Sequence, residues 1–329
     1  MTVLRIAFLS IVGSLVVSTA QAKKLLILTD QPGATKANEI RKLIQTTVPF
    51  KLLKSSEFSI SVEYVDPKTK PVSCKPRKIK YTDDEIYSLQ YWAKVKGIEI
   101  SPEELKKYKE GYTIDRLVEC DLVALAALGV QFQADSLMFV HNSPWEGGSG
   151  GDIPIILSGS RPGIGMHEWL HGFGLADEYA YKKEEAPFFC NRTDWGNVAI
   201  FNDAPPYSSN DDVRIRHRDQ IPWLTYLSPK ADLITSNNLG SPKFGNLGIY
   251  QSSTCKNVSP TLKSWKPSGH MTIMENPLST YIPKPYWTNI LTGLGVGSDR
   301  IAALLKVSVT PTWLKSGGQG PGNPPPQVE

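Results

Sequence analysis

The chain has 329 residues, of which 40% are hydrophobic and 21% charged, a balance that is typical of a globular protein and excludes collagen and coiled coil. Its 36 Lys and Arg against 32 Asp and Glu give a net charge of +4, and the basic residues are spread along the chain, so no nucleic-acid partner is indicated. The 26 Gly and 25 Pro predict a loop-rich fold around a sizeable core.

The first 22 residues predict a secretory signal peptide. Met1–Arg5 is a short basic start, Ile6–Val17 is an almost unbroken apolar run, and Ala20-Gln21-Ala22 fits the small-x-small cleavage rule. The apolar run is shorter than the roughly 20 residues that span a bilayer, which argues against a membrane anchor. We therefore expect a secreted or periplasmic protein that begins at Lys23 and has no membrane span in its mature part.

The start of the mature chain predicts a strand, a helix and a second strand, an order that indicates an α/β layer. Lys24–Thr29 is a short apolar run, Ala37–Val48 has apolar residues close to helical spacing, and Phe58–Val65 alternates. Pro67–Lys80 is rich in Pro and Lys without an apolar period, so we expect an exposed loop there.

Three helices and two strands are expected next. Two of the helices begin at the N-caps Thr82 and Ser101, each followed by acidic residues. The apolar content of Thr113–Leu128 predicts a long core helix. Ser136–Val140 and Ile153–Leu157 are predicted strands on either side of a glycine-rich loop.

The segment GMHEWLHGFGLADEY contains the strongest functional signal in the sequence. His167 and His171 lie four residues apart, so a helix projects both imidazoles from one face with Glu168 beside them, as in zinc peptidases. A catalytic zinc needs a third protein ligand and an open position for water. Gly174 can end the helix in a left-handed turn, and the returning chain can then bring Asp177 to the metal.

Other residues are alternatives for the third ligand. Glu178 is adjacent to Asp177, and either carboxylate is an acceptable zinc donor, although a surface turn or a partner for a histidine nitrogen is the alternative to both. In a different kind of zinc peptidase, a glutamate from a later helix, such as Glu184 or Glu185, would be the ligand. The turn at Gly174 argues against that arrangement.

The pattern H-E-x-x-H-x-x-G-x-x-D resembles the metzincin signature, with Asp in place of the usual His. Metzincins also have a methionine turn beneath the metal, and the segment GHMTIMENP supplies Met274 about a hundred residues downstream. Met271 is the weaker candidate. Either methionine alone would be interpreted as core filling, but the two segments together make the assignment more specific.

Four blocks occur in order along the chain: FVHNSPWEGGSGG, HEWLHGFGLADEY, IRHRDQIPWL and TIMENPLSTYIPKPYW. Together they resemble the secreted IgA-peptidase family of bacterial zinc metalloendopeptidases over most of Phe139–Leu291, while Lys23–Ala134 is similar only in its strand and helix pattern. Family members carry one more residue before the LADEY block, which keeps both Asp177 and Glu178 open as ligands. The family name records the substrate of one member, and IgA cleavage is not carried over.

The resemblance implies an α/β (α+β) fold, in which a metzincin-like catalytic domain has a mixed sheet packed with helices, an active-site helix and a methionine turn. We place this domain at residues 23–315, with an upper lobe at about 23–176 and a lower lobe at about 177–315. The Gly- and Pro-rich residues 316–329 are expected to be a disordered tail.

The expected function is that of a secreted, monomeric zinc metalloendopeptidase with one catalytic Zn²⁺ and a protein or peptide substrate. A zinc-activated water would attack the peptide carbonyl, with Glu168 as general base and then general acid. The alternative is a secreted zinc-containing binding protein or adhesin without catalysis. The presence of Glu168 argues against it, because a structural zinc site has no use for a base.

Substrate contacts are less defined by the sequence. An extended peptide would add a strand to a sheet edge, for which Ile153–Leu157 is the candidate, and an interior strand is its alternative. A further donor to the oxyanion could come from Tyr179, Tyr281 or Tyr286, and the sequence does not choose among them.

The four cysteines are an even number in a chain that is expected to be exported, so two disulfides are predicted. We favour Cys74 with Cys120 and Cys190 with Cys255, because each pair lies on one side of the metal-binding segment. The alternative for Cys74 is a thiolate that blocks the metal before activation.

Overall fold

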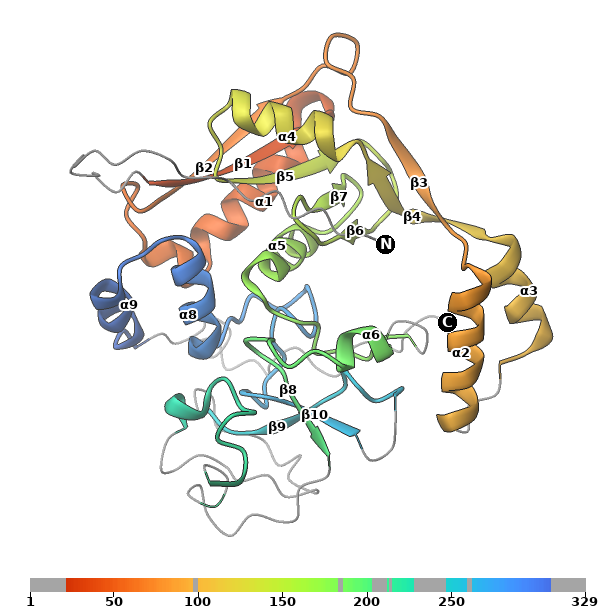
Figure 1. Ribbon diagram of the computed structural model, residues 1–329. Helices are drawn as coiled ribbons and strands as arrows, with labels where there is room; N and C mark the ends of the chain where they lie inside the picture. Colours follow the sequence, from red (N-terminus) through yellow and green to blue (C-terminus); the bar gives the residue numbers. More distant parts are fainter. Residues whose placement is uncertain are drawn as a thin grey trace, which may run out of the picture.

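The computed structural model describes residues 22–96, 100–182, 186–202, 212, 215–227, 247–258 and 262–308. Over these residues the protein is a mixed α/β structure, built on a mixed sheet with helices against both faces (Figure 1). The predicted α/β class is confirmed at this level. Across the sheet the strands are, in order, β2 (Phe58–Tyr64), β1 (Lys23–Thr29), β5 (Ser136–His141), β7 (Ile155–Leu157) and β6 (Gly148–Ser149).

The four strands β2, β1, β5 and β7 run parallel, and β6 runs antiparallel to β7. Successive residues of β1 enter two different cores: Leu25 and Ile27 lie on one face of the sheet, and Leu26 and Leu28 lie on the other. A parallel sheet that is covered on both faces has strands that read as continuous apolar runs. The continuous apolar run KLLILT therefore indicates a strand, although its apolar and polar residues do not alternate.

Helices cover the two faces of this sheet. On one face, α1 (Thr35–Thr46) and α5 (Pro162–Leu170) share a core with β1. On the other face, α4 (Leu122–Gln131) packs through Leu125 and Leu128. Helix α5 therefore lies directly against the main core.

The C-terminal helices belong to the same core as α1 and α5. Tyr286 and Trp287 of α8 (Lys284–Gly293) and Leu304 of α9 (Ser298–Leu305) are buried in it. The last helices that the structure describes therefore share one core with strand β1 (Figure 1).

A second, antiparallel sheet lies at the opposite end of the molecule from the main sheet (Figure 1). Its own core includes Trp223, Trp265 and Phe201. A disulfide joins Cys190, in the short helix α6 (Ala186–Cys190), to Cys255, which comes shortly after the strand at residues 250–252 of this sheet. The three strands are, in order, β8 (Ala199–Asn202), β10 (Leu262–Lys266) and β9 (Tyr250–Ser252).

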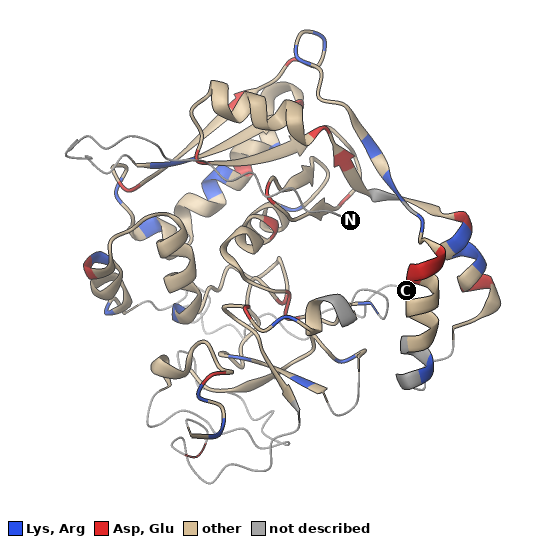
Figure 2. Cartoon of the chain, in the orientation of Figure 1, with Lys and Arg blue, Asp and Glu red and all other residues tan. Residues whose placement is uncertain are grey.

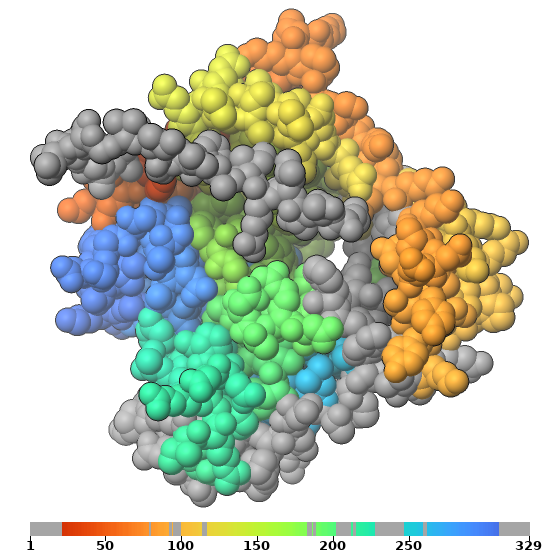
Figure 3. All heavy atoms as spheres, viewed as in Figure 1, coloured from red at the N-terminus to blue at the C-terminus, as the bar shows by residue number. Residues whose placement is uncertain are grey.

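A two-stranded hairpin with two helices at its tip forms an arm at the side of the molecule (Figures 1 and 3). Cys74 and Cys120 face each other at its base and form the first disulfide. Figure 2 shows basic residues along the first strand and acidic residues in the opening turn of the helix that follows, where they complement the helix dipole. The arm consists of β3 (Cys74–Ile79), α2 (Asp83–Lys96), α3 (Pro102–Glu110) and β4 (Tyr112–Cys120).

The arm corrects two predictions. The expected loop at Pro67–Lys80 is wrong in its second half, because β3 pairs there with β4. The expected long helix Thr113–Leu128 is also wrong, because its first part is β4 and only its second part belongs to α4. The boundary between them is set by Asp121, whose carboxylate caps α4 by accepting from the backbone N–H of Val123 and Ala124, each at 3.0 Å.

Several local predictions are confirmed. The first strand, the first helix and the second strand lie where they were expected. Ser101 caps α3 in a complete capping box with Glu104. Both favoured disulfides are formed, so Cys74 is not a thiolate that could block a metal, and two disulfides fit an oxidising compartment.

Other predictions fall on residues that the structure does not describe. These are the signal peptide, apart from Ala22, the tail at residues 316–329, and the alternative ligands Glu184 and Glu185. Among the described residues, no helix has the length and apolar character needed to cross a membrane.

Two glycines of α5 lie where other parts of the chain approach the helix closely. A Cβ at Gly163 would lie 1.8 Å from the backbone oxygen of Pro277, whereas one at Gly165 would meet the side-chain end of Ile40 at 2.6 Å. Ala in a helix is ordinarily favoured over Gly by about 1 kcal/mol. We expect Gly163→Ala instead to lower the free energy of unfolding by about 1–3 kcal/mol, because a backbone atom must move. Thermal unfolding should show a smaller loss for Gly165→Ala, and equal losses would contradict this account.

Candidate metal centre

Helix α5 carries His167 and Glu168 of the H-E-x-x-H motif, and His171 follows directly after the helix. It begins at Pro162, whose fixed φ suits the first helical turn, and after Leu170 the residues His171–Phe173 form a single 3-10 turn. Gly174 then adopts the predicted left-handed conformation, with φ of 75°. The chain turns back at this point and brings Asp177 over the end of the helix.

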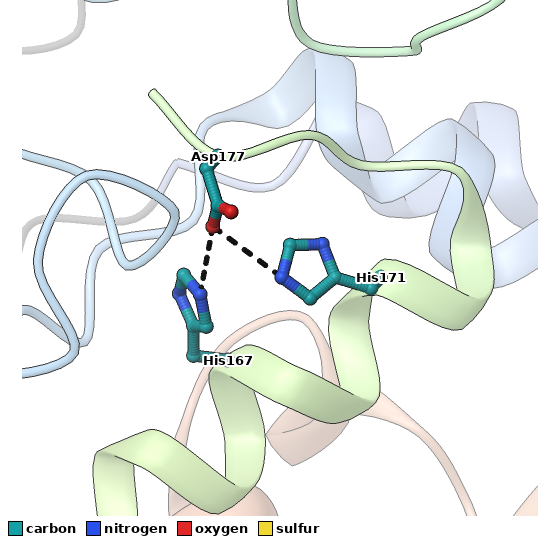
Figure 4. Close-up of side chains that lie close together, drawn as sticks. All are labelled: His167, His171 and Asp177. Atoms are coloured by element: carbon teal, nitrogen blue, oxygen red, sulfur yellow. Dashed lines mark ion pairs between the residues drawn. The ribbon is translucent and has the colours of Figure 1, made fainter. Parts of the chain in front are cut away.

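Three side chains converge at this place (Figure 4). The Nε2 atom of His167 lies 2.9 Å from Oδ1 of Asp177, and the Nε2 atom of His171 lies 3.3 Å from the same oxygen. One possible ligand atom from each residue lies within 4.8 Å of the others. His167 and Asp177 are buried, while the side chain of His171 is 20% exposed, so the group is open on the side of His171.

Backbone carbonyl groups fix the orientation of both imidazoles. Nδ1 of His167 lies 2.8 Å from the carbonyl oxygen of Ile273, and Nδ1 of His171 lies 2.7 Å from that of Leu175. Because a carbonyl oxygen only accepts, both Nδ1 atoms must carry a proton. In the neutral imidazoles the lone pairs are therefore on Nε2, the atoms that face Asp177.

The buried carboxylate has the character of a metal ligand. Oδ1 of Asp177 is buried and accepts no hydrogen bond of normal geometry, although two imidazole nitrogens lie close to it. An unsatisfied buried carboxylate oxygen is costly. A cation held between this oxygen and the two Nε2 atoms would satisfy all three. The donor set of two imidazoles and one carboxylate fits a divalent metal such as zinc and leaves a fourth position open.

The ionisable groups influence one another strongly. Burial disfavours the charged form of His171, but the Asp177 carboxylate outweighs this effect and raises the pKa of His171 to about 9. Burial by itself would raise the pKa of Asp177, yet the two imidazoles hold that pKa well below its usual range. Burial raises the pKa of Glu168, with the two imidazoles opposing the shift.

Glu168 lies beside the group rather than within it. Its Oε2 atom is 3.9 Å from Nε2 of His171, and its side chain is 15% exposed. The edge strand β6 and Gly150, the residue after it, lie close to Glu168: a Cβ at Gly150 would lie 3.2 Å from Oε2 of Glu168 and 3.0 Å from Cδ2 of His171. A Cβ at Gly148 would lie 3.1 Å from Cγ of Glu168. The glycines thus allow the sheet edge to approach the metal group closely.

The predicted sheet edge was wrong. Ile153–Leu157 was the candidate for the edge, but β7 lies between β5 and β6 and is buried. The edge of the described sheet on this side is β6, which the glycine-rich segment forms by running back antiparallel to β7. The alternative interpretation of Ile153–Leu157, an interior strand, is therefore confirmed.

The two adjacent carboxylates have separate environments. Asp177 joins the histidines, whereas Glu178 is fully buried among Tyr286, Thr272 and Asn197 and takes no part in the group. Burial raises the pKa of Glu178, against the opposing effect of the Lys266 ammonium.

Of the three tyrosines considered from the sequence, one lies beside the metal group. Tyr179 stacks on His167 with ring centroids 6.1 Å apart, and its hydroxyl interacts with Asp177. Tyr286 is fully buried and donates to Glu178. The ring of Tyr281 packs edge-on against His270.

Met274 lies in a turn that contacts the segment that carries Asp177 and Glu178. It is fully buried in the main core, and its backbone oxygen accepts a hydrogen bond from the backbone N–H of Glu178 at 2.9 Å. The preceding residue, Ile273, supplies the carbonyl that orients His167. Thr272 closes the turn by accepting from the backbone N–H of Glu275 at 3.1 Å.

Sequence reasoning missed several residues that support the group. Gly148 and Gly150 could have been suspected from their place in a glycine-rich segment just ahead of the zinc motif. Asn197 gave no signal, and Thr272 lay in the segment GHMTIMENP without being singled out, because each is a single polar residue whose partners lie in another part of the sequence.

The comparisons with known proteins give no family assignment: neither the family models nor the curated proteins that were searched contain a match to this chain.

Metal binding provides a direct test of the group. We expect the protein to hold one Zn²⁺, and Asp177→Ala to weaken zinc affinity by more than about 100-fold, the upper limit for partners outside the ligand set. Competition with a chromophoric chelator would measure this affinity. Asp152→Ala, which removes an exposed carboxylate, is the matched control and should bind zinc as the wild type does. A wild-type protein that takes up no zinc would refute the site.

Proposed function

We propose that the protein is a secreted zinc-dependent metalloendopeptidase with a metzincin-like catalytic domain. The observation that carries the proposal is the arrangement of His167, His171 and Asp177, with Glu168 beside His171, the partly exposed member of the group. The predicted signal peptide and the two disulfides support export.

The residues of the group would hold the metal through Nε2 of His167, Nε2 of His171 and Oδ1 of Asp177. Zinc bound to three protein ligands lowers the pKa of a water in its open position to about 7. The carbonyls of Ile273 and Leu175 would keep the imidazoles oriented toward it.

Glu168 is suited to move the proton. It lies outside the ligand set but within reach of the same open side, and burial raises the pKa of its carboxyl group, which makes the carboxylate a better base. In the proposed reaction Glu168 accepts the proton of the attacking water and then returns it to the amine of the leaving peptide. Of the three tyrosines considered, we propose Tyr179, whose ring stacks on His167, as the donor to the oxyanion.

The edge strand β6 is the proposed platform for the substrate. An extended peptide that adds to a sheet edge is held by main-chain hydrogen bonds, so the strand itself needs no large side chains. With Gly148 and Gly150 against Glu168, a peptide on this edge would pass beside the proposed base.

Catalysis is tested by Glu168→Gln. The variant should retain zinc and fold but lose about 10²- to 10⁴-fold or more in the rate of casein digestion, because an amide cannot accept the proton. Glu146→Gln, at an exposed glutamate that pairs with Arg161, is the control and should keep full activity. A zinc-loaded wild type that digests no unfolded protein would contradict the proposal and favour the binding-protein alternative.

Peptide binding is tested by Gly150→Val. Its side chain would press on Glu168 and His171, so we expect at least a tenfold loss in kcat/KM. Circular dichroism would verify the fold, and metal analysis would verify the zinc content. Gly297→Val places the same side chain where no atom lies within 4 Å of the new Cβ, and activity should persist. Equal effects of the two substitutions would rule out a role in the site for Gly150, the residue after β6.

A further inference from the structure

The carboxylate of Glu178 collects donors from distant parts of the chain. Its Oε1 atom accepts from the hydroxyl of Tyr286 and from Nδ2 of Asn197, the latter at 3.0 Å. Its Oε2 atom accepts from the hydroxyl of Thr272 at 2.7 Å and lies 3.8 Å from the ammonium of Lys266. All of these residues are buried, so each contact is shielded from water.

The backbone around Glu178 is held as firmly. Its N–H donates to the carbonyl of Met274 at 2.9 Å, and its carbonyl accepts from the N–H of Ser253 and the hydroxyl of Ser252, each at 3.1 Å. The hydroxyl of Thr254 donates to the carbonyl of Asp177 at 2.7 Å. Ala176, the residue before the proposed ligand Asp177, is fixed as well.

The side chain of Asn197 holds the backbone of Ala176. Its amide accepts from the N–H of Ala176 at 2.7 Å and donates to the carbonyl of Ala176 at 2.8 Å. The same Nδ2 reaches Glu178. The residues on both sides of Asp177 are therefore fastened by one buried side chain.

The turn at residues 272–275 connects this network to the helix. Thr272 donates to the side chain of Glu178 and Met274 accepts from its backbone, while Ile273 between them accepts from His167. Two of the three proposed ligands, one on α5 and one after Gly174, are thus tied to the same short turn.

The charges around Glu178 are balanced in part. Lys266 is 4% exposed and pairs closely with Glu275, in addition to its longer contact with Glu178. A buried carboxylate persists only where donors compensate for the loss of water. A simple packing role would be served at lower cost by an apolar residue of similar volume.

From this arrangement we infer that Glu178 is a positioning residue: by joining the Asp177 segment to the turn at residues 272–275, it holds Asp177 and His167 at the separation that metal binding requires. The inference rests on the proposed metal group but not on peptidase activity. Partners that orient ligands typically contribute about 10- to 100-fold to metal affinity.

The test is the affinity of the fully folded protein for Zn²⁺ alone, measured by chelator competition well below the melting temperature. Thr272→Val removes one donor to Glu178 at nearly constant volume, and we expect it to weaken zinc binding about tenfold. Glu178→Ala should weaken it further, toward about 100-fold. Glu178→Gln, which can still accept from Tyr286 and Asn197, should restore most of the affinity.

Ser279→Ala is the matched control. It removes another buried hydroxyl near the turn, which donates to the carbonyl of Met271 at 2.8 Å and does not touch Glu178. It should leave zinc affinity unchanged. If Thr272→Val lowers only the melting temperature and binds zinc as tightly as Ser279→Ala, the positioning role is overturned, and this result does not require Glu178→Ala to fold.

The outcome is separable from that of the proposed function. If the wild type hydrolyses no peptide but zinc affinity follows the expected order of variants, Glu178 positions a metal site that is not catalytic, and the inference stands. If the wild type binds no zinc, both the inference and the proposed function fail.

Discussion

The close packing of helix α5 is the constraint on which the rest of the structure depends. The helix approaches α1 closely at Gly165, and it approaches the backbone of Pro277 closely at Gly163. A third contact, from strand β6, is made through Gly148. Side chains at these positions would separate the helix from its neighbours. Because α5 carries His167 and Glu168 and leads directly into His171, the geometry of the group formed by His167, His171 and Asp177 follows from these approaches.

The convergence of His167, His171 and Asp177 was predictable because its information is local. The interval between His167 and His171 is set by helical geometry, and Gly174 and Asp177 follow within one turn and one loop. The choice between Asp177 and Glu178 was not local. It depends on Asn197, Thr272 and Tyr286, which come from distant segments and surround one carboxylate with donors while the other meets two imidazoles. Asp177 and Glu178 are adjacent in the sequence but differ in role, because their side chains lie in different buried surroundings.

The fold likewise has elements that local sequence predicts and elements that depend on pairing with distant residues. Strands buried on both faces were found from apolar runs, and Ser101 marked the start of a helix through its capping box. The errors lay where pairing spans long distances. Strand β3 carries exposed basic residues and became a strand only by pairing with β4 across the arm, and the apolar residues of β4 continued into α4 so that the two read as one helix. Periodicity could not separate them, whereas the cap at Asp121 does.

The arm leaves the body and returns to it at almost the same point, since the Cα atoms of Cys74 and Cys120 are 4.0 Å apart and joined by a disulfide. For the path of the chain, the excursion begins and ends at one point between β2 and α4, and only its strand β4 also lies against β6 and β7 among the contacts described. Its helices can therefore lengthen, shorten or be exchanged during evolution without disturbing the strands or the metal group. In that sense the arm is a module, and related chains could differ most in this region while sharing the same body.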